Sequence, residues 1–366
     1  MNHKPVLQDK KTSSPLSVKK RALRSAQDVR KAGLLTSEED NGLSHLEEQY
    51  DIGISAHVHG LIKDPHDPVA RQYVPSAREL QIQKNEEADP IGDDIYCPVK
   101  GIVHRYPDRV LLKATNICAV YCRYCFRKEM IGSGSDHLSD DDLNQAIDYI
   151  QNHKQIWEVI LTGGDPFILS ARRLHRIIEA LNQIDHVQVI RIHSRIPVAD
   201  PQKITDTHLG VLKSSSKAIH TVIHVNHRQE ISEQVENAIL RLRQSGISVL
   251  SQSVLLKGVN DDPVVLETLF RKLVTLHVQP YYLHHLDHAK GTSHFRVSIE
   301  KGKEIMKSLQ GRISGICLPR YMLDIPGGHG KIPIDDGYVH ALGDNLYRLE
   351  DYQGCEHLYE EGTQCT

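Results

Sequence analysis

Three cysteines stand within eight residues of one another in the stretch ATNICAVYCRYCFRKEM, although the whole chain contains only seven. They are Cys118, Cys122 and Cys125, spaced as C-x3-C-x2-C. Zinc normally takes a fourth ligand at similar spacing, and none is evident, since His104 precedes the cluster and His137 follows a Gly/Ser-rich stretch. Iron–sulfur clusters usually take four thiolates, so three leave one iron open to a non-protein ligand. The spacing therefore predicts a reactive iron–sulfur centre.

Other polar clusters recur along the chain at regular intervals. They are GGDP (163–166), HSR (193–195), NHR (226–228), Gln252 and HHLDHAKG (284–291). Each of these clusters, and the cysteine cluster, ends or follows an apolar, β-branched run. The six runs are 110–115, 157–162, 187–193, 218–225, 247–255 and 278–286. Since the active site of an α/β barrel lies at the carboxyl ends of its strands, this placement predicts an enzyme.

Four stretches between the runs have apolar residues at helical spacing. They are 141–153, 171–184, 234–246 and 264–277. Strands that alternate with helices of this length indicate parallel βαβ units. This alternation of strands and helices predicts the α/β class and an open or closed α/β barrel, with a doubly wound sheet as the alternative.

The chain divides into three predicted parts. Residues 1–95 read as a polar, helical N-terminal region interrupted by prolines, residues 96–325 as the barrel, and residues 326–366 as an irregular extension rich in Gly and acidic residues. The formal net charge is -3, which argues against nucleic-acid binding by charge alone. No signal peptide or membrane-length apolar run is found, and the scattered remaining cysteines do not suggest disulfides. We therefore expect a cytoplasmic protein with reduced thiols.

The cysteine spacing, with Tyr124 before the last cysteine, resembles the radical S-adenosylmethionine (SAM) superfamily. This resemblance implies a partial (β/α)6 barrel and a [4Fe–4S] cluster on the three cysteines, with SAM bound at the open iron. Gly163, Gly164 and Asp165 resemble the glycine-rich strand end that binds the methionyl amine, where glycines allow close backbone approach and the aspartate supplies an anion. Gln252, near the end of the fifth run, is also assigned to cofactor binding.

Five further segments are similar in order and spacing to the lysine 2,3-aminomutases. They are residues 104–128, 191–198, 252–262, 279–296 and 323–333. The resemblance implies that pyridoxal 5'-phosphate is attached to Lys331 of the PGGHGK run, and that Arg105, Tyr106 and Arg109 cradle its phosphate and ring. It further implies that Arg127 grips the substrate carboxylate, while Asp287 and Asp324 hold the remote ammonium of lysine.

The implied reaction is the radical isomerisation of L-α-lysine to β-lysine, with a reducing partner such as flavodoxin or ferredoxin. The family's zinc site at subunit contacts uses a cysteine where this chain has Asp262, so whether a zinc site exists stays open. The oligomeric state also stays open, a homo-oligomer included. Two alternatives remain. One is the related lysine isomerase that serves elongation factor P, and the other is a noncatalytic metal-binding barrel protein, suggested by 23 histidines.

Overall fold

The centre of the molecule is a nine-stranded sheet whose strands follow one another in sequence order. The computed structural model describes residues 20–35, 40, 42–132, 136–334, 338–343, 346–351 and 354–360. The strands are β1 (Ile102–Tyr106), β2 (Arg109–Thr115), β3 (Glu158–Gly163), β4 (Val189–Ser194), β5 (Ala218–His224), β6 (Ser248–Val254), β7 (Gln279–His284), β8 (Arg320–Ile325) and β9 (Gly330–Pro333). β2 to β8 are parallel, while β1 and β9 are antiparallel edge strands.

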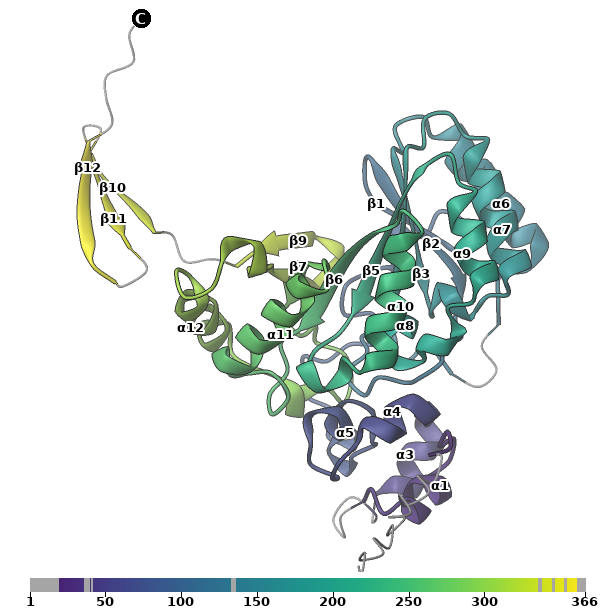
Figure 1. The fold of residues 1–366 in the computed structure, drawn as a ribbon, viewed down its shortest axis with the longest axis horizontal. Coiled ribbons are helices and arrows are strands. Elements are labelled where there is room, and N and C mark those ends of the chain that lie inside the picture. Colours follow the sequence, from purple (N-terminus) through teal and green to yellow (C-terminus); the bar gives the residue numbers. More distant parts are fainter. Residues whose placement is uncertain are drawn as a thin grey trace, which may run out of the picture.

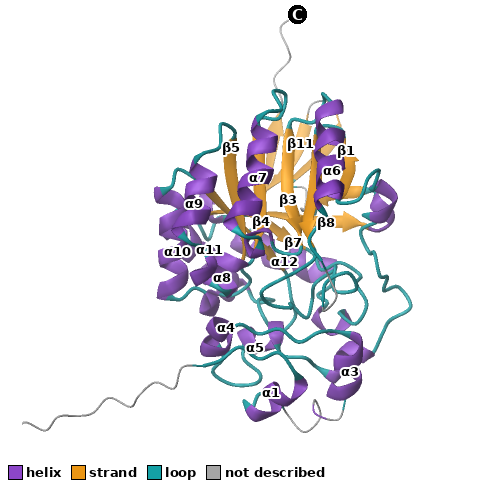
Figure 2. Cartoon of the chain, turned by 90° about the vertical axis from the view of Figure 1, so that its right-hand side faces the viewer, coloured by secondary structure: helices purple, strands orange, loops and turns teal. Residues whose placement is uncertain are grey.

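Helices cover the outer face of this sheet (Figures 1 and 2). They are α6 (Asp140–Asn152), α7 (Ala171–Asn182), α8 (Ile196–Ala199), α9 (Asp206–Lys213), α10 (Glu233–Gln244), α11 (Pro263–Thr275) and α12 (Ile299–Leu309). A polar side chain caps the start of most of them, as Ser139 does for α6 by accepting a hydrogen bond from the Asp142 N–H. Leu143, Ala146 and Ile150 then lie on the buried face of α6. The core lies between these faces and the sheet.

The predicted α/β barrel class is confirmed. The six predicted strands correspond to β2 to β7, and the four predicted helices to α6, α7, α10 and α11. The sequence did not predict β1, β8 and β9, which extend the sheet at both edges. The two edge strands meet through one hydrogen bond, 2.8 Å long, from the Lys331 N–H in β9 to the Tyr106 hydroxyl in β1.

The described part of the N-terminal region contains short helices and turns around a small hydrophobic cluster that also includes Val120 and Ala199. Its elements are α1 (Ala26–Lys31), α3 (Leu43–Gln49), α4 (Ala56–Leu61), α5 (Pro68–Tyr73) and the 3-10 turns η1 (Ala77–Leu80) and η2 (Asp94–Tyr96). Figures 1 and 2 both place α1, α3, α4 and α5 at one end of the sheet. Backbone bonds from Tyr121 to Gly53 and from Arg123 to Gln72 attach this region to the cysteine loop at the carboxyl ends of the strands.

The prediction of an irregular C-terminal extension was wrong for the described residues. They form a three-stranded antiparallel sheet of β10 (Val339–Gly343), β11 (Leu346–Glu350) and β12 (Glu356–Glu360), drawn apart from the barrel in Figure 1. Cross-strand pairs such as Val339 with Leu349 and Tyr347 with Tyr359 set its register. Strands of five residues separated by turns carry too few apolar residues to stand out in a glycine-rich, acidic segment.

The predicted division at residues 95 and 325 stays a prediction, although the main sheet itself continues past residue 325 through β9. Residues 1–19 and 361–366, including Cys365, lie outside the described residues. None of the helices in the described part of the chain is both long and apolar enough to cross a bilayer.

Candidate active site

One cavity of about 560 Å³ opens at the carboxyl ends of the barrel strands and reaches into the barrel. Its size is that of ordinary cofactor and substrate sites. Every site residue predicted from the sequence lines it. They are Cys118, Cys122, Cys125, Gly163, Gly164, Asp165, Gln252, Arg105, Tyr106, Arg109, Arg127, Asp287, Asp324 and Lys331. Residues up to 226 positions apart in the sequence therefore share one site, although their individual roles stay predictions.

The three cysteines follow β2 in an irregular loop and are free thiols. Burial is the main cause that raises the pKa of each, to about 11 for Cys125, so a nearby cation is needed to keep three thiolates here. Within the described residues, no three histidine, cysteine or acidic side chains surround one common ion position. A multi-iron cluster does not require that arrangement, because its thiolates bind different irons. The donor set therefore suits a cluster better than a single ion.

Glu79, from the N-terminal region, fixes both sides of the cysteine loop. Its carboxylate is fully buried and accepts three hydrogen bonds of 2.7 to 3.0 Å from Arg123, plus one of 2.9 Å from Lys128. Burial alone would raise the pKa of Glu79, but Arg123 and Lys128 lower it to about 2. Glu79 is therefore ionised at neutral pH, and it ties the residues that flank Cys122 and Cys125 to η1.

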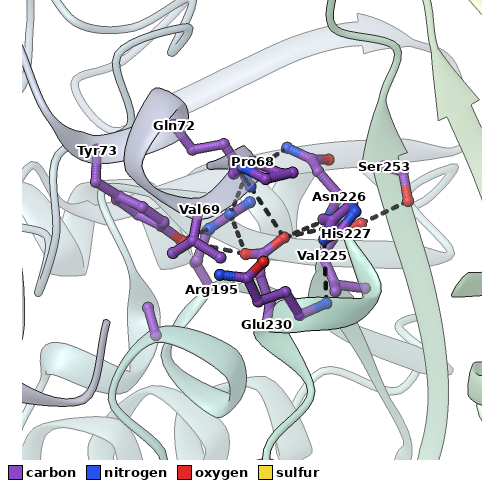
Figure 3. A network of polar contacts seen from close by, with 12 residues as sticks. Pro68, Val69, Gln72, Tyr73, Arg195, Val225, Asn226, His227, Glu230 and Ser253 are labelled. Atoms are coloured by element: carbon purple, nitrogen blue, oxygen red, sulfur yellow. Dashed lines mark hydrogen bonds and ion pairs between the residues drawn. The ribbon is translucent and has the colours of Figure 1, made fainter. Parts of the chain in front are cut away.

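A second buried network, centred on Arg195 and Glu230, also holds the cysteine loop (Figure 3). Arg195, at the end of β4, donates to the hydroxyls of Tyr73 and Tyr124, to the Gln72 side-chain oxygen and to Glu230 at 2.5 to 2.7 Å. Since Tyr124 directly precedes Cys125, the network links the cysteine loop to α5 and to the ends of β4 and β5. All of its side chains are buried, so the loop is held by specific bonds.

The glycines of the GGDP run let β3 end against the cysteine loop. A Cβ on Gly163 would lie 2.5 Å from the Thr115 carbonyl oxygen, and one on Gly164 would lie 2.3 Å from that of Ile117. Gly163 also has a φ of +108°, which a side chain disfavours. Asp165 accepts bonds from the Ser194 hydroxyl (2.6 Å) and from three backbone N–H groups, so it joins the ends of β3 and β4. Its predicted contact with the methionyl amine stays a prediction.

Lys331 faces Asp324 across the β8–β9 pair. The register places the two residues directly opposite each other, and Lys331 Nζ lies 2.7 and 2.6 Å from the two carboxylate oxygens of Asp324. The preceding PGG run is packed against η2, since a Cβ on Gly328 would lie 2.7 Å from the Tyr96 ring. The PGG run is therefore in contact with the N-terminal region, and Lys331 itself lies in β9.

Asp287 is the second carboxylate predicted to bind the remote ammonium. It follows β7, and burial followed by the charge of Asp324 raises its pKa to about 7. A buried carboxyl whose pKa is raised by a neighbouring carboxylate marks a place where a cation is stabilised. In this structure, the ammonium of Lys331 is the cation that Asp324 holds.

Arg127 and Arg105 meet at Asp93, which the sequence did not single out. Asp93 accepts a 2.8 Å bond from Arg127 and a 3.0 Å bond from Arg105. Arg105 also lies 4.0 Å from Asp324. Arg109 stacks over the Tyr106 ring, with its guanidinium carbon 4.0 Å from the ring centroid.

Several buried donors in the cavity have no partner within the described protein. They are Arg105 Nε, Arg191 Nε and His193 Nε2. Buried donors without acceptors suit an anionic ligand such as a phosphate ester. Gln252 contacts His224, and burial lowers the pKa of His224 and of His284 to about 3, so both imidazoles are neutral. The residues present therefore fit a phosphorylated cofactor.

Sequence reasoning missed the contribution of the N-terminal region to this site. Gln72, Tyr73, Glu79 and Asp93 all contact residues of the cavity wall, yet each is a single polar residue in a segment without periodicity. The sequence does offer one signal for this region, because Ser76 and Glu79 have the spacing of a capping box, which the structure forms at η1. The bonds that Arg123 and Lys128 donate to Glu79 could not be predicted, because nothing in the sequence pairs residues that far apart.

Comparisons with known proteins match these features. The radical SAM superfamily profile covers residues 112–268, and the profile described as lysine-2,3-aminomutase covers residues 306–366. The match to the first profile places the chain in the class of radical SAM barrel proteins. A putative L-lysine 2,3-aminomutase of Aquifex aeolicus is 40% identical over 91% of this chain and 90% of its own. The L-lysine 2,3-aminomutase of Methanococcus maripaludis is 45% identical over 81% of this chain and 68% of its own.

The chain belongs to the lysine 2,3-aminomutase family. The family uses a [4Fe–4S] cluster, SAM and pyridoxal phosphate, and these are the cofactors predicted from the sequence. The glutamate 2,3-aminomutase of Clostridioides difficile is also similar, with 35% identity over 87% of this chain and 76% of its own. Family membership therefore leaves the choice of amino acid to be argued from the site.

Proposed function

We propose that this chain is an L-lysine 2,3-aminomutase, an isomerase that converts L-α-lysine into β-lysine. The observation that carries the choice of lysine is the pair Asp287 and Asp324, which line the same cavity as Lys331 and the three cysteines. A cationic side chain is stabilised beside two carboxylates, whereas the side-chain carboxylate of glutamate would be repelled there. Asp324 already binds one alkylammonium group, that of Lys331.

The proposal gives each predicted residue a binding task. Cys118, Cys122 and Cys125 hold the cluster, and the residues assigned to SAM are Gly163, Gly164, Asp165 and Gln252. Lys331 attaches pyridoxal phosphate, and the residues assigned to its phosphate and ring are Arg105, Tyr106 and Arg109. When bound, the cluster and SAM supply the radical that removes hydrogen from a carbon of the substrate, and pyridoxal phosphate carries the migrating amino group.

The protein side chains bind and orient the substrate. Arg127 pairs with its α-carboxylate, and Asp287 and Asp324 pair with its ε-ammonium, so that both ends of the lysine are fixed. The bond from the Lys331 N–H to Tyr106 holds β9 against β1, which closes the side of the cavity. The N-terminal region lies at the carboxyl ends of the strands and contributes Asp51, Ile91 and Asp93 to the cavity wall.

The test is an anaerobic incubation of the purified protein with L-lysine, SAM, pyridoxal phosphate and dithionite, followed by product analysis. We expect β-lysine from L-lysine, and no β-amino acid from L-glutamate or L-alanine under the same conditions. Turnover of glutamate but not lysine would contradict the assignment of the two aspartates. A fully assembled cluster that never cleaves SAM would favour the noncatalytic alternative.

Chiral analysis of the product addresses the elongation factor P alternative, since the two isomerases differ in the stereochemistry of their β-lysine. The proposal also includes a cytoplasmic location and a reducing partner such as flavodoxin or ferredoxin.

A further inference from the structure

Asp93 is a buried carboxylate shared by two arginines of the cavity. Only 1% of its surface is exposed. Its Oδ2 accepts from Arg127 Nη2 at 2.8 Å and from Arg127 Nε at 3.3 Å, while its Oδ1 accepts from Arg105 Nη2 at 3.0 Å. Asp93 itself is anchored outside the barrel, where its N–H donates to Asp89 at 2.9 Å.

We infer that Asp93 is the positioning residue that orients Arg127 for the α-carboxylate of the amino-acid substrate. The inference rests on the proposed function, in which Arg127 binds that carboxylate. It adds a residue from the N-terminal region to the recognition of the substrate, and it gives that region a task in the reaction.

The geometry of the guanidinium group supports this role. A guanidinium pairs with a carboxylate along one of two edges, the side edge of Nε and Nη2 or the terminal edge of Nη1 and Nη2. Asp93 occupies the side edge. The face of the group lies against the Phe126 ring, with Arg127 Cζ 4.4 Å from its centroid. At the terminal edge, Arg127 Nη1 donates a long, 3.5 Å bond to the Thr162 hydroxyl. With one edge and one face fixed, this weakly bonded terminal edge is the part that Arg127 presents to a ligand carboxylate.

Asp93 also connects the two predicted ends of the substrate site. It binds Arg127 at one oxygen and Arg105 at the other, and Arg105 Nη1 lies 4.0 Å from Asp324. The chain Arg127–Asp93–Arg105–Asp324 alternates in charge from the carboxylate subsite to the ammonium subsite. A single carboxylate therefore sets the spacing between the groups that hold the two ends of lysine.

The charge of Asp93 is maintained by its partners. Burial alone would raise the pKa of this carboxyl, but Arg127, Lys113 and Arg105 hold it below its usual value. Asp93 thus stays ionised at neutral pH and keeps strong, charge-assisted bonds to both arginines. An asparagine of the same shape would keep weaker contacts and leave the side edge of Arg127 available to a ligand.

The test compares Asp93→Asn with the wild type. Partners that orient a ligand-binding group are worth about 10- to 100-fold in affinity. We expect the Kd of L-lysine, measured by calorimetry, and the KM to rise by about that factor, while kcat, iron content and the absorbance of lysine-bound pyridoxal phosphate stay near wild-type values. The adjacent, exposed Asp94 provides the matched control Asp94→Asn, which should bind L-lysine normally.

Three further measurements separate orientation from general damage. L-Lysinamide lacks the carboxylate, so Asp93→Asn should weaken its binding much less than that of L-lysine. Combined with Arg127→Lys, the effect of Asp93→Asn should largely disappear, because the two residues act as a unit. The conservative variant Asp93→Glu keeps the charge and should recover part of the affinity for L-lysine.

Three results would overturn the inference. They are normal lysine binding by Asp93→Asn, equal losses for L-lysine and L-lysinamide, and loss of the cluster together with lysine binding in both Asp93 variants. A failure of the proposed function looks different, since a wild-type protein that neither binds nor turns over L-lysine would fail before any variant is compared.

Discussion

Lys331 Nζ lies within 2.7 Å of both carboxylate oxygens of Asp324, directly across an antiparallel strand pair. The proposed function assigns these groups to different partners, Lys331 to pyridoxal phosphate and Asp324 to the ammonium of the substrate. Both assignments hold if Asp324 pairs first with the Lys331 ammonium and later with the ε-ammonium of the substrate. With pyridoxal phosphate held at Lys331, the nitrogen of Lys331 would no longer be the free ammonium that pairs with Asp324 here, and Asp324 would be available to the ε-ammonium of lysine.

The first prediction concerns Lys331. Lys331→Ala should lose the absorbance band of lysine-bound pyridoxal phosphate, because the amine that attaches the cofactor is absent, while the iron content stays at the wild-type level. Lys290 is half-buried in another loop of the rim and does not line the cavity, so Lys290→Ala should keep both signals. An unchanged cofactor band in Lys331→Ala would place the cofactor lysine elsewhere.

The second prediction concerns the two aspartates. Removing one partner of a buried charge pair costs about 2–5 kcal/mol. Asp287→Asn and Asp324→Asn should therefore each lower kcat/KM for L-lysine by roughly two orders of magnitude or more. Cluster content and cofactor absorbance should not change, which separates recognition from folding.

Asp148 on the exposed side of α6 supplies the control, since Asp148→Asn removes a carboxylate far from the cavity lining. Its kinetics should match those of the wild type. If both cavity variants turn over lysine normally, the ammonium is bound elsewhere, and activity of the wild type on glutamate or alanine then identifies the substrate.

Much of this site could be predicted from the sequence, because parallel strands bring polar residues to one edge of a sheet. Cys118, Gly163 and Asp287 follow different strands and line one cavity. The strands of the barrel could be predicted where apolar, β-branched runs alternate with amphipathic helices. β1 and β8 were missed because polar residues interrupt their short apolar patterns, as in IVHRY and RYMLDI.

The contribution of the N-terminal region could not be predicted for a different reason. Gln72 and Arg195 are 123 positions apart, and their contact depends on how α5 packs at the ends of β4 and β5. Asp93 and Glu79 are equally isolated in sequence. A buried polar residue has no periodic neighbours that reveal its partner, so only the folded chain identifies it.

The third prediction concerns the cluster. Cys122→Ala should remove the brown chromophore and most of the iron from anaerobically prepared protein, because two thiolates cannot replace three. Exposed Cys97 is the matched control, and Cys97→Ala should keep the iron and the chromophore. Retention of the full cluster by Cys122→Ala would contradict the assignment of the three cysteines.

The fourth prediction concerns stability. Glu230 pairs with Arg195 at 2.6 Å, and the two side chains are only 1% and 8% exposed. Breaking a buried pair by removing one charge costs about 3–5 kcal/mol. We place Glu230→Gln at the lower end of that range, because Gln72, Tyr73 and Tyr124 still bind Arg195.

The urea midpoint of Glu230→Gln, measured under anaerobic conditions, should therefore fall clearly below that of the wild type. Glu233→Gln changes an exposed residue in the first turn of α10 and should leave the urea midpoint at the wild-type value. Since Tyr124 belongs to the same network, the variant should also lose iron faster when challenged with a chelator. Equal midpoints for the two variants would contradict a structural role for the pair.

The fifth prediction concerns pH and follows from Asp287. Burial is the largest cause that raises its pKa to about 7, followed by Asp324, and Asp93 acts in the same direction, while Lys331 and Arg127 lower it. Below pH 7 most of the free protein therefore has a neutral Asp287. A bound ε-ammonium stabilises the ionised carboxylate, so substrate binding must lower this pKa and release a proton. Affinity for L-lysine should rise as the pH increases from 6 to 8.

Proton release can be measured by calorimetry, because the apparent binding enthalpy then depends on the ionisation enthalpy of the buffer. We expect L-lysine to release a proton at pH 6 and almost none at pH 8.5, where Asp287 is already ionised. L-Norleucine has the same α-amino and α-carboxylate groups but no ε-ammonium, so its binding should show no such release at either pH. Equal release by both amino acids would assign the proton to another group, and no release with L-lysine at pH 6 would mean that Asp287 does not receive the ammonium.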